Sequence, residues 1–176
     1  MRTTHYVNLF CLACLCAAGP VRAETAVEHV LYTFGNYPGG ANPYGTPALD
    51  SDGNLYGTTF EGGGANVGVV FEWSSSGYRI LHDFAGGSDG ANPYAGVTLD
   101  SAGNIYGTAY NGGPANAGVV YEIPAGGKET VLYAFTGGSD GAHPYAGVIL
   151  DASGNLYGTA YQGGSHNLGV VWQLIP

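Results

Sequence analysis

Positive charge is the scarcest property of this 176-residue sequence, which has four Lys and Arg residues against 13 Asp and Glu residues. Charged residues of both signs make up only 10% of the chain. Binding to nucleic acid requires clustered basic side chains that replace counterions, and attraction to anionic lipid surfaces has the same requirement. The composition therefore excludes a nucleic-acid partner and disfavours binding to anionic membranes.

Cysteine is also scarce, and its three copies all lie near the N-terminus, at positions 11, 14 and 16. This region has the features of an export signal: an arginine at position 2, an apolar stretch over residues 9–19 and a small-x-small site at residues 21–23. The apolar stretch is too short for a permanent membrane helix. We predict a signal peptide over residues 1–23 and a cysteine-free domain over residues 24–176, with a periplasmic, extracellular or cell-surface location and no membrane insertion.

Helical periodicity is missing from the rest of the chain, while glycine (32 residues) and tyrosine (14 residues) are abundant. A hydrophobic content of 45% indicates a packed core despite the glycine. The stretch NIYGTAY, residues 104–110, alternates two sets of side chains as a half-buried strand does. We therefore expect an all-β protein whose many glycines lie in turns.

Three sequence repeats fill the predicted mature domain. They begin with VLYTF at Val30, ILHDF at Ile80 and VLYAF at Val131, and we assign them to residues 30–79, 80–130 and 131–176. Each continues through a glycine-rich loop with Pro-Tyr, the motif DxxGN[LI]YGT and a GVV-aromatic segment. Four strand signals in about 50 residues are typical of a propeller blade. We predict three β-propeller-type blades of about four short antiparallel strands each, as a partial propeller or half of a closed oligomeric propeller.

The segment DSAGN, residues 100–104, joins two predicted strands and is typical of a tight hairpin turn. Asp accepts hydrogen bonds from the turn backbone, and Gly and Asn tolerate positive φ. A calcium loop would instead require several oxygen ligands at alternate positions. Only the first repeat offers two such carboxylates, since Ala102 and Ser153 replace the second one elsewhere. We predict a turn and keep Asp50 and Asp52 as calcium candidates.

The third repeat reads VLYAFTGGSDGAHPYAGVILDASGNLYGTAYQGG and then NLGVVWQL, and this pattern resembles the GloVer repeat of choice-of-anchor bacterial exported proteins. The resemblance covers Val30 to Ile175. The segment AGVTLDSAGNIYGTA is more distantly similar to strands of NHL-type propeller blades. The resemblance implies export and a repeated β architecture, usually in longer arrays with a surface anchor, and it implies no established activity. This sequence has three repeats and no sorting tail.

A closed propeller usually contains four to eight blades, so three blades leave two open ends. In propeller wiring each VLYxF segment is the outer strand of the preceding blade. Val30–Phe34 then has no preceding blade, and the third repeat has no outer strand. One hypothesis is a six-bladed homodimer, in which the N-terminal strand of one copy completes the third blade of the other. An open three-blade arrangement and a fragment of a longer array are the alternatives.

One end of the predicted blades gathers tyrosines, amides and histidines from the loops after the outer and second strands. Tyrosine rings beside amides suit a glycan or peptide ligand. The ligand-binding candidates are Asn92, Tyr94, Tyr110, Asn111, His143, Tyr145, Tyr161, Gln162 and His166. The alternative is that the Pro-Tyr tyrosines pack one blade on the next and that the asparagines cap their own loops.

Catalytic chemistry finds little support in the sequence. His143 and His166 have only Asp140 as an obvious third metal ligand, so we predict no metal site and no cofactor. Ser88 and Ser139 lie beside Asp in GGSD segments, but the sequence positions neither a nucleophile elbow nor a partnered histidine for them. We therefore predict a non-catalytic binding or cell-surface structural module. The alternatives are a polysaccharide hydrolase or lyase and a truncated remnant of a longer repeat array.

Overall fold

The computed structural model describes residues 26–35 and 38–176, so the predicted signal peptide lies outside the described residues. Residues 32–176 form one compact unit. Throughout the described ranges the regular elements are β-strands, which confirms the predicted all-β class. No helix in these ranges has the length and apolar character needed to span a membrane.

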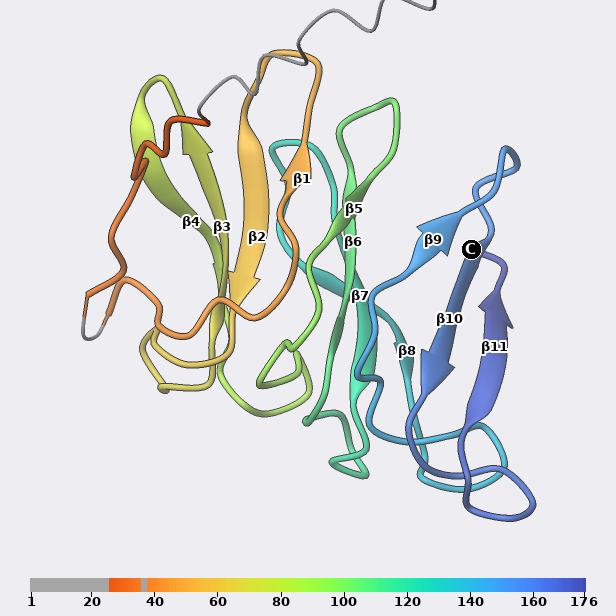
Figure 1. The fold of residues 1–176 in the computed structure, drawn as a ribbon. Coiled ribbons are helices and arrows are strands. Elements are labelled where there is room, and N and C mark those ends of the chain that lie inside the picture. The colour runs from red at the N-terminus through yellow and green to blue at the C-terminus, as the bar shows by residue number, and fades with distance from the viewer. Residues whose placement is uncertain (1–25, 36–37) are drawn as a thin grey trace, which may run out of the picture. The chain divides into compact units, whose positions relative to one another are not determined.

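The first sheet, termed blade one, contains four antiparallel strands in sequence order (Figure 1). They are β1 (Ala48–Leu49), β2 (Leu55–Thr59), β3 (Val69–Ser74) and β4 (Gly77–Asp83). A β-bulge between Val70 and Phe71 shifts the register of β3 against β4. Because β4 contains the start of the second repeat, that repeat supplies the outer strand of the first blade, as the pattern predicts.

The second sheet, blade two, has the same order and a bulge at the equivalent place, between Val120 and Tyr121. Its strands are β5 (Thr98–Leu99), β6 (Ile105–Ala109), β7 (Val119–Ile123) and β8 (Thr130–Ala134). The third sheet, blade three, has three strands: β9 (Ile149–Leu150), β10 (Leu156–Ala160) and β11 (Val170–Leu174). The prediction of about four short strands in each of three propeller-type blades is confirmed.

The first VLYxF segment differs from the other two. The sequence predicts a strand over residues 30–34, whereas the structure contains no strand or bridge there. An extended segment forms a strand only when a sheet edge accepts its hydrogen bonds, and β4 already covers the outer edge of β3. The segment therefore has no sheet to join within its own chain, as the propeller wiring predicts.

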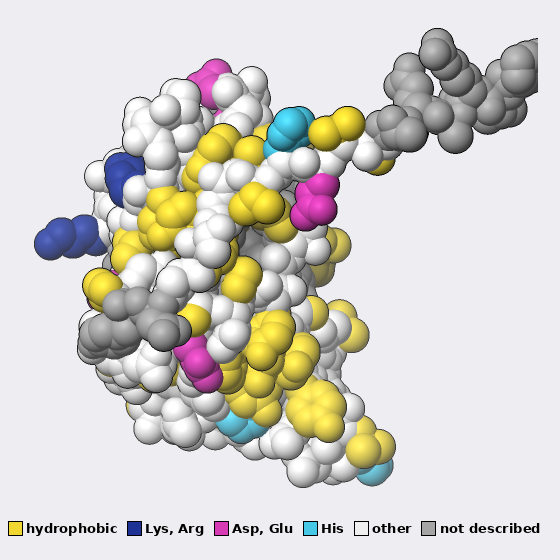
Figure 2. Space-filling view, turned by 60° about the vertical axis from the view of Figure 1, so that its left-hand side comes forward, with side chains coloured by type: hydrophobic (Ala, Val, Ile, Leu, Met, Phe, Trp, Pro, Cys, Tyr) yellow, Lys and Arg dark blue, Asp and Glu magenta, His cyan; other side chains and the backbone are white. Residues whose placement is uncertain are grey.

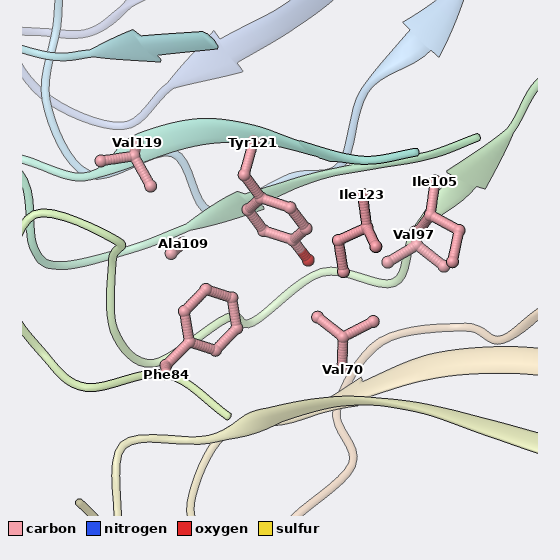
Figure 3. Close-up of a cluster of buried hydrophobic side chains, with 8 residues drawn as sticks. All are labelled: Val70, Phe84, Val97, Ile105, Ala109, Val119, Tyr121 and Ile123. Atoms are coloured by element: carbon pink, nitrogen blue, oxygen red, sulfur yellow. The ribbon is translucent and has the colours of Figure 1, made fainter. Parts of the chain in front are cut away.

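The hydrophobic core lies between neighbouring blades and is divided into two clusters. The first joins blades one and two (Figure 3) and contains Val70, Phe84, Val97, Ile105, Ala109, Val119, Tyr121 and Ile123. The second joins blades two and three and contains Tyr106, Ala117, Val120, Phe135, Ala142, Val148, Leu156 and Ala160. We term the face of a blade that carries Val70 or Val120 its trailing face. This face packs on the leading face of the next blade, which carries Tyr121 or Trp172.

The glycine of each YGT motif makes room for an aromatic side chain on the neighbouring strand. A Cβ atom at Gly107 would lie 2.3 Å from the hydroxyl of the fully buried Tyr121. The equivalent positions repeat this crowding, at 2.7 Å between Gly57 and Phe71 and at 2.3 Å between Gly158 and Trp172. These glycines are therefore explained by ring packing inside each blade.

Candidate functional site

Three isolated β-bridges hold the loops together at one end of the blades. They pair Ala41 with Glu61, Ala91 with Asn111 and Ala142 with Gln162. In each blade the bridge joins the glycine-rich loop before the inner strand to the loop after the second strand. This pairing holds the two loops together at one end of each blade, where the sequence predicted that they would meet.

Two residues with positive φ attach these loops to the preceding blade. Asn92 and His143 have φ values of 55° and 54°. Their backbone N–H groups donate to the carbonyls of Val67 and Ala117, each at 2.7 Å. The Asn92 side chain also donates to the Phe60 carbonyl at 3.1 Å. The left-handed conformation is tolerated by Asn and His, so each blade is bonded to its neighbour at this point.

The Pro-Tyr tyrosines of the three blades stack on one another. Tyr94 stacks on Tyr145, with ring centroids 4.2 Å apart and an interplanar angle of 18°. Tyr44 stacks on the other side of Tyr94 at 5.6 Å and 26°. The two outer members are well exposed, at 63% for Tyr44 and 54% for Tyr145. We term Tyr44, Tyr94 and Tyr145 the tyrosine ladder.

A second row of aromatic residues follows the second strand of each blade. The ring centroids of Phe60 and Tyr94 lie 4.5 Å apart, and those of Tyr110 and Tyr145 lie 5.8 Å apart. Each ring of this row therefore contacts the ladder tyrosine of the next blade. Tyr110 also stacks on His143 at 4.6 Å. Burial, together with the neighbouring tyrosines, raises the pKa of Tyr94. The ladder therefore forms a continuous, uncharged aromatic surface.

The structure brings together some of the predicted ligand-binding residues. Six of them share this surface: Asn92, Tyr94, Tyr110, Asn111, His143 and Tyr145. The Asn111 side chain donates to the Asn92 side chain at 3.1 Å. Figure 2 views the molecule from the side of the first sheet and shows hydrophobic side chains gathered next to a histidine.

Three predicted residues lie apart from the stacked rings, in the loop after β10. Tyr161 is 64% exposed, and no ring contact is recorded for it within the described residues. His166 is exposed beside Ser165, with 2.9 Å between their Nδ1 and Oγ atoms, and Gln162 forms the bridge to Ala142. In the ranges 26–35 and 38–176 no group of three or more metal-ligating side chains forms around the two histidines or elsewhere.

Sequence reasoning missed one member of the surface, Phe60, and placed Tyr44 at this end of the blades without naming it as a ligand-binding candidate. Both occupy repeat positions that it identified in other blades, since Tyr44 aligns with Tyr94 and Phe60 aligns with Tyr110. Phe60 lacks the polar group that drew attention to the tyrosines. The signal that finds both residues is equivalence between repeats.

The DxxGN motif forms a turn at the opposite end of the strands. One oxygen of Asp100 accepts hydrogen bonds from the backbone N–H groups of Ala102 and Asn104, at 2.8 and 2.9 Å. The other oxygen accepts from the Asn104 side chain at 2.9 Å and from the Tyr106 hydroxyl at 3.3 Å. Burial opposes ionisation, but these hydrogen bonds outweigh it and lower the pKa of Asp100.

The calcium candidates lie in the equivalent turn of blade one. Asp50 accepts the same set of bonds, from Asp52, from Asn54 and from the Tyr56 hydroxyl. Positive φ in this turn belongs to Gly53, at 85°. Asn54 uses its side chain to donate to Asp50, at 2.9 Å.

The repeat that builds this surface matches a known protein family. The family model described as the Gloeobacter/Verrucomicrobia repeat matches residues 20–176. The chain belongs to this repeat family. The resemblance to the GloVer repeat is thereby confirmed, and the protein is a repeat module of that family. No curated protein matches the chain.

Proposed function

We propose that this repeat module is an exported, non-catalytic binding protein whose tyrosine ladder binds a neutral glycan. The observation that carries the proposal is the stack of Tyr44, Tyr94 and Tyr145, whose outer rings are exposed at 63% and 54%. Exposed aromatic faces stack on the apolar faces of sugar rings, and neighbouring polar groups fix the orientation. Asn92 and Asn111 supply amides beside the ladder.

Charge favours a neutral ligand over an anionic one. The chain carries a formal net charge of −9, which repels anionic polysaccharides over the whole surface. Glu61 adds a carboxylate near the ladder, where it accepts a hydrogen bond from the Asn42 side chain at 2.9 Å. Neutral β-glucans and mannans are therefore the ligand class that we propose.

The proposal that the protein is non-catalytic rests on the position of Glu129, the carboxyl group whose pKa is raised toward neutrality. Burial, together with the nearby Asp89 carboxylate, raises the pKa of Glu129 to about 7, which suits a general acid. Glu129 precedes β8 in blade two and its Oε1 atom is buried, whereas the outer rings of the ladder are exposed. A glycoside hydrolase requires its acid and a second carboxylate on the same bound sugar.

Native electrophoresis in gels that contain soluble polysaccharide tests the binding proposal. We expect a neutral β-glucan or mannan to retard the protein, and polygalacturonate to leave its mobility unchanged. Tyr145→Ala should weaken binding about fivefold to tenfold, while Tyr145→Phe retains it, because stacking needs only the ring. Mobility that no neutral polysaccharide changes would contradict glycan binding, and new reducing ends in the same incubations would contradict a non-catalytic role.

Export is tested separately, by intact-mass measurement of the protein purified from its producing cell. Cleavage after Ala23 predicts a mature chain that begins at Glu24 and contains no cysteine. A mass that retains residues 1–23 would contradict the export proposal and leave the glycan test unaffected.

A further inference from the structure

Blade three exposes the face that the other two blades bury. Val70 and Val120 are both 0% exposed on their trailing faces, because the next blade covers them. The equivalent Val171 is 82% exposed. Leu168, which aligns with the buried Ala117, is 87% exposed. The trailing face of blade three is thus a hydrophobic surface with the composition of a blade interface.

At each interface between blades, a threonine hydroxyl of one blade donates a hydrogen bond to a backbone carbonyl of the next blade. The equivalent threonine and the equivalent carbonyl are both present at the two open ends of the repeat array. The Thr58 hydroxyl donates to the Ala95 carbonyl at 2.7 Å, and the Thr108 hydroxyl donates to the Ala146 carbonyl at 3.0 Å. The next donor in this series is Thr159, which is exposed on blade three. The carbonyl that precedes the series is that of Gly45, in blade one, which aligns with Ala95.

Blade three also has room for an outer strand. A cavity of about 310 Å³ lies between blade two and β11, next to the unpaired edge of β11, and its lining includes Val120, Tyr133, Trp172 and Leu174. The buried indole N–H of Trp172 faces no hydrogen-bond partner within the described residues. In blade two the equivalent space is occupied by β8, whose Val131 pairs with Tyr121.

The segment that aligns with β4 and β8 is Val30–Phe34, and it is free of any sheet. Val30 and Leu31 are exposed at 74% and 52%. Phe34 is already placed like the last residue of an outer strand: its ring lies 5.2 Å from Phe71 at 65°. The equivalent pairs show 5.4 Å and 68° for Phe84 with Tyr121 and 5.8 Å and 62° for Phe135 with Trp172.

We propose that a second copy of this chain covers blade three, with its Val30–Phe34 segment paired to β11 as the missing outer strand. The leading face of the second copy's blade one then packs on the trailing face of blade three. The same contact in the opposite direction gives two identical seams, so that two copies close the assembly. Unpaired strand edges and exposed apolar faces are removed together.

The repeat alignment fixes the register of the seam. In blades one and two the bulge-flanking pairs are Val70 with His82 and Val120 with Tyr133, so Val171 pairs with Tyr32 of the second copy. Val69 with Asp83 likewise predicts Val170 with Thr33. Val30 of the second copy then aligns with Trp172 and enters the cavity.

The tyrosine ladder continues across this seam. Phe60 contacts Tyr94 and Tyr110 contacts Tyr145, so the exposed Tyr161 is positioned to contact Tyr44 of the second copy. The inference does not depend on glycan binding. A monomer that binds glycan would overturn only the seam, and a dimer that binds none would overturn only the proposed function.

Light scattering after size exclusion of the purified protein is the first test. We expect twice the mass of one chain for the unchanged protein and the mass of one chain for Val171→Asp. Because Val171 is exposed, this variant should keep the melting temperature of the monomer. Thr130→Asp, at an exposed position of β8, is the matched control and should remain a dimer. A monomeric unchanged protein, or a Val171→Asp dimer, would overturn the proposal.

A designed disulfide tests the register. A chain that carries both Thr33→Cys and Val170→Cys should form a disulfide-linked dimer under mild oxidation, visible on a non-reducing gel. Thr33→Cys combined with Thr130→Cys should give no linked dimer, because these positions do not meet in the seam. A disulfide within a single chain of the first variant, or equal linkage in both variants, would overturn the proposed pairing.

Discussion

Blades two and three have nearly the same sequence and very different surroundings. Val120 and Tyr121 in blade two are 0% exposed, whereas Val171 in blade three is 82% exposed and Trp172 is half-buried. Within blade two, from β5 to β8, no large hydrophobic side chain is exposed, although both end blades carry several. The exposed fraction of a side chain in a repeat protein therefore depends on the neighbouring repeats as much as on the residues of its own repeat.

The largest effect should come from the phenylalanine that follows each outer strand. Phe84 is fully buried, so Phe84→Ala should lower the free energy of unfolding by about 4 kcal/mol. Phe34 makes the same ring contact but is only half-buried, so Phe34→Ala should cost about 1 kcal/mol in the monomer. Urea unfolding at low protein concentration measures both, and equal losses would contradict the role of neighbouring blades.

Alanine substitutions of the YGT glycines, which lie beneath the aromatic rings of β7 and β11, should destabilise blade two more than blade three. The difference should be smaller than for the phenylalanines. Gly107→Ala should cost about 3 kcal/mol, because the enclosed Tyr121 cannot move away from the new methyl group. Gly158→Ala should cost about 1 kcal/mol, because Trp172 borders the cavity and can shift into it. Urea unfolding of the two variants would show the reverse order if Trp172 were the more rigid ring.

Removal of a threonine hydroxyl should also have different effects in the buried blade two and in the exposed blade three. Thr108→Val leaves the Ala146 carbonyl without its donor, so it should cost about 1 kcal/mol of unfolding free energy. Thr159→Val should leave the stability of the monomer unchanged and should weaken the dimer. Thermal unfolding gives the first value and dilution followed by light scattering gives the second. A dimer insensitive to Thr159→Val would count against the hydrogen bond to Gly45.

The smallest effect concerns Glu129, which occupies in blade two the position that Tyr78 holds in blade one. Burial raises its folded-state pKa to about 7, above the usual 4.5, so the folded protein retains a proton that the unfolded chain has lost. Stability therefore falls as the pH rises from about 4.5 to 7. Glu129→Gln should raise the melting temperature by about 2 °C at pH 8 and leave it unchanged at pH 4. A gain of equal size at both pH values would rule out ionisation of Glu129 as its cause.

Local and repeated features of the structure were predictable from the sequence. The alternation in residues 104–110 and the repetition of the whole pattern predict the strands and their order. The Asp100 turn was predictable because its bonds lie within seven consecutive residues. The ladder tyrosines were predictable as candidates, but their stacking was not, because it depends on the spacing between blades.

Features that depend on distant partners could not be read from the pattern. The repeat pattern shows that the segment 30–34 has no preceding blade in its own chain, but it does not show that the Phe34 ring packs on Phe71. Phe60 was overlooked because the chemical argument selected polar groups rather than equivalent positions.

Hydrogen–deuterium exchange can show whether a second copy covers blade three, because one experiment compares β7 with β11. At a concentration at which the protein is monomeric, residues 170–174 should exchange much faster than residues 119–123. When the concentration is raised, protection should appear in residues 170–174 and in residues 30–34 together, and β7 should not change. Exchange in β11 that is independent of concentration would contradict the account, because its edge would then have no second copy to cover it.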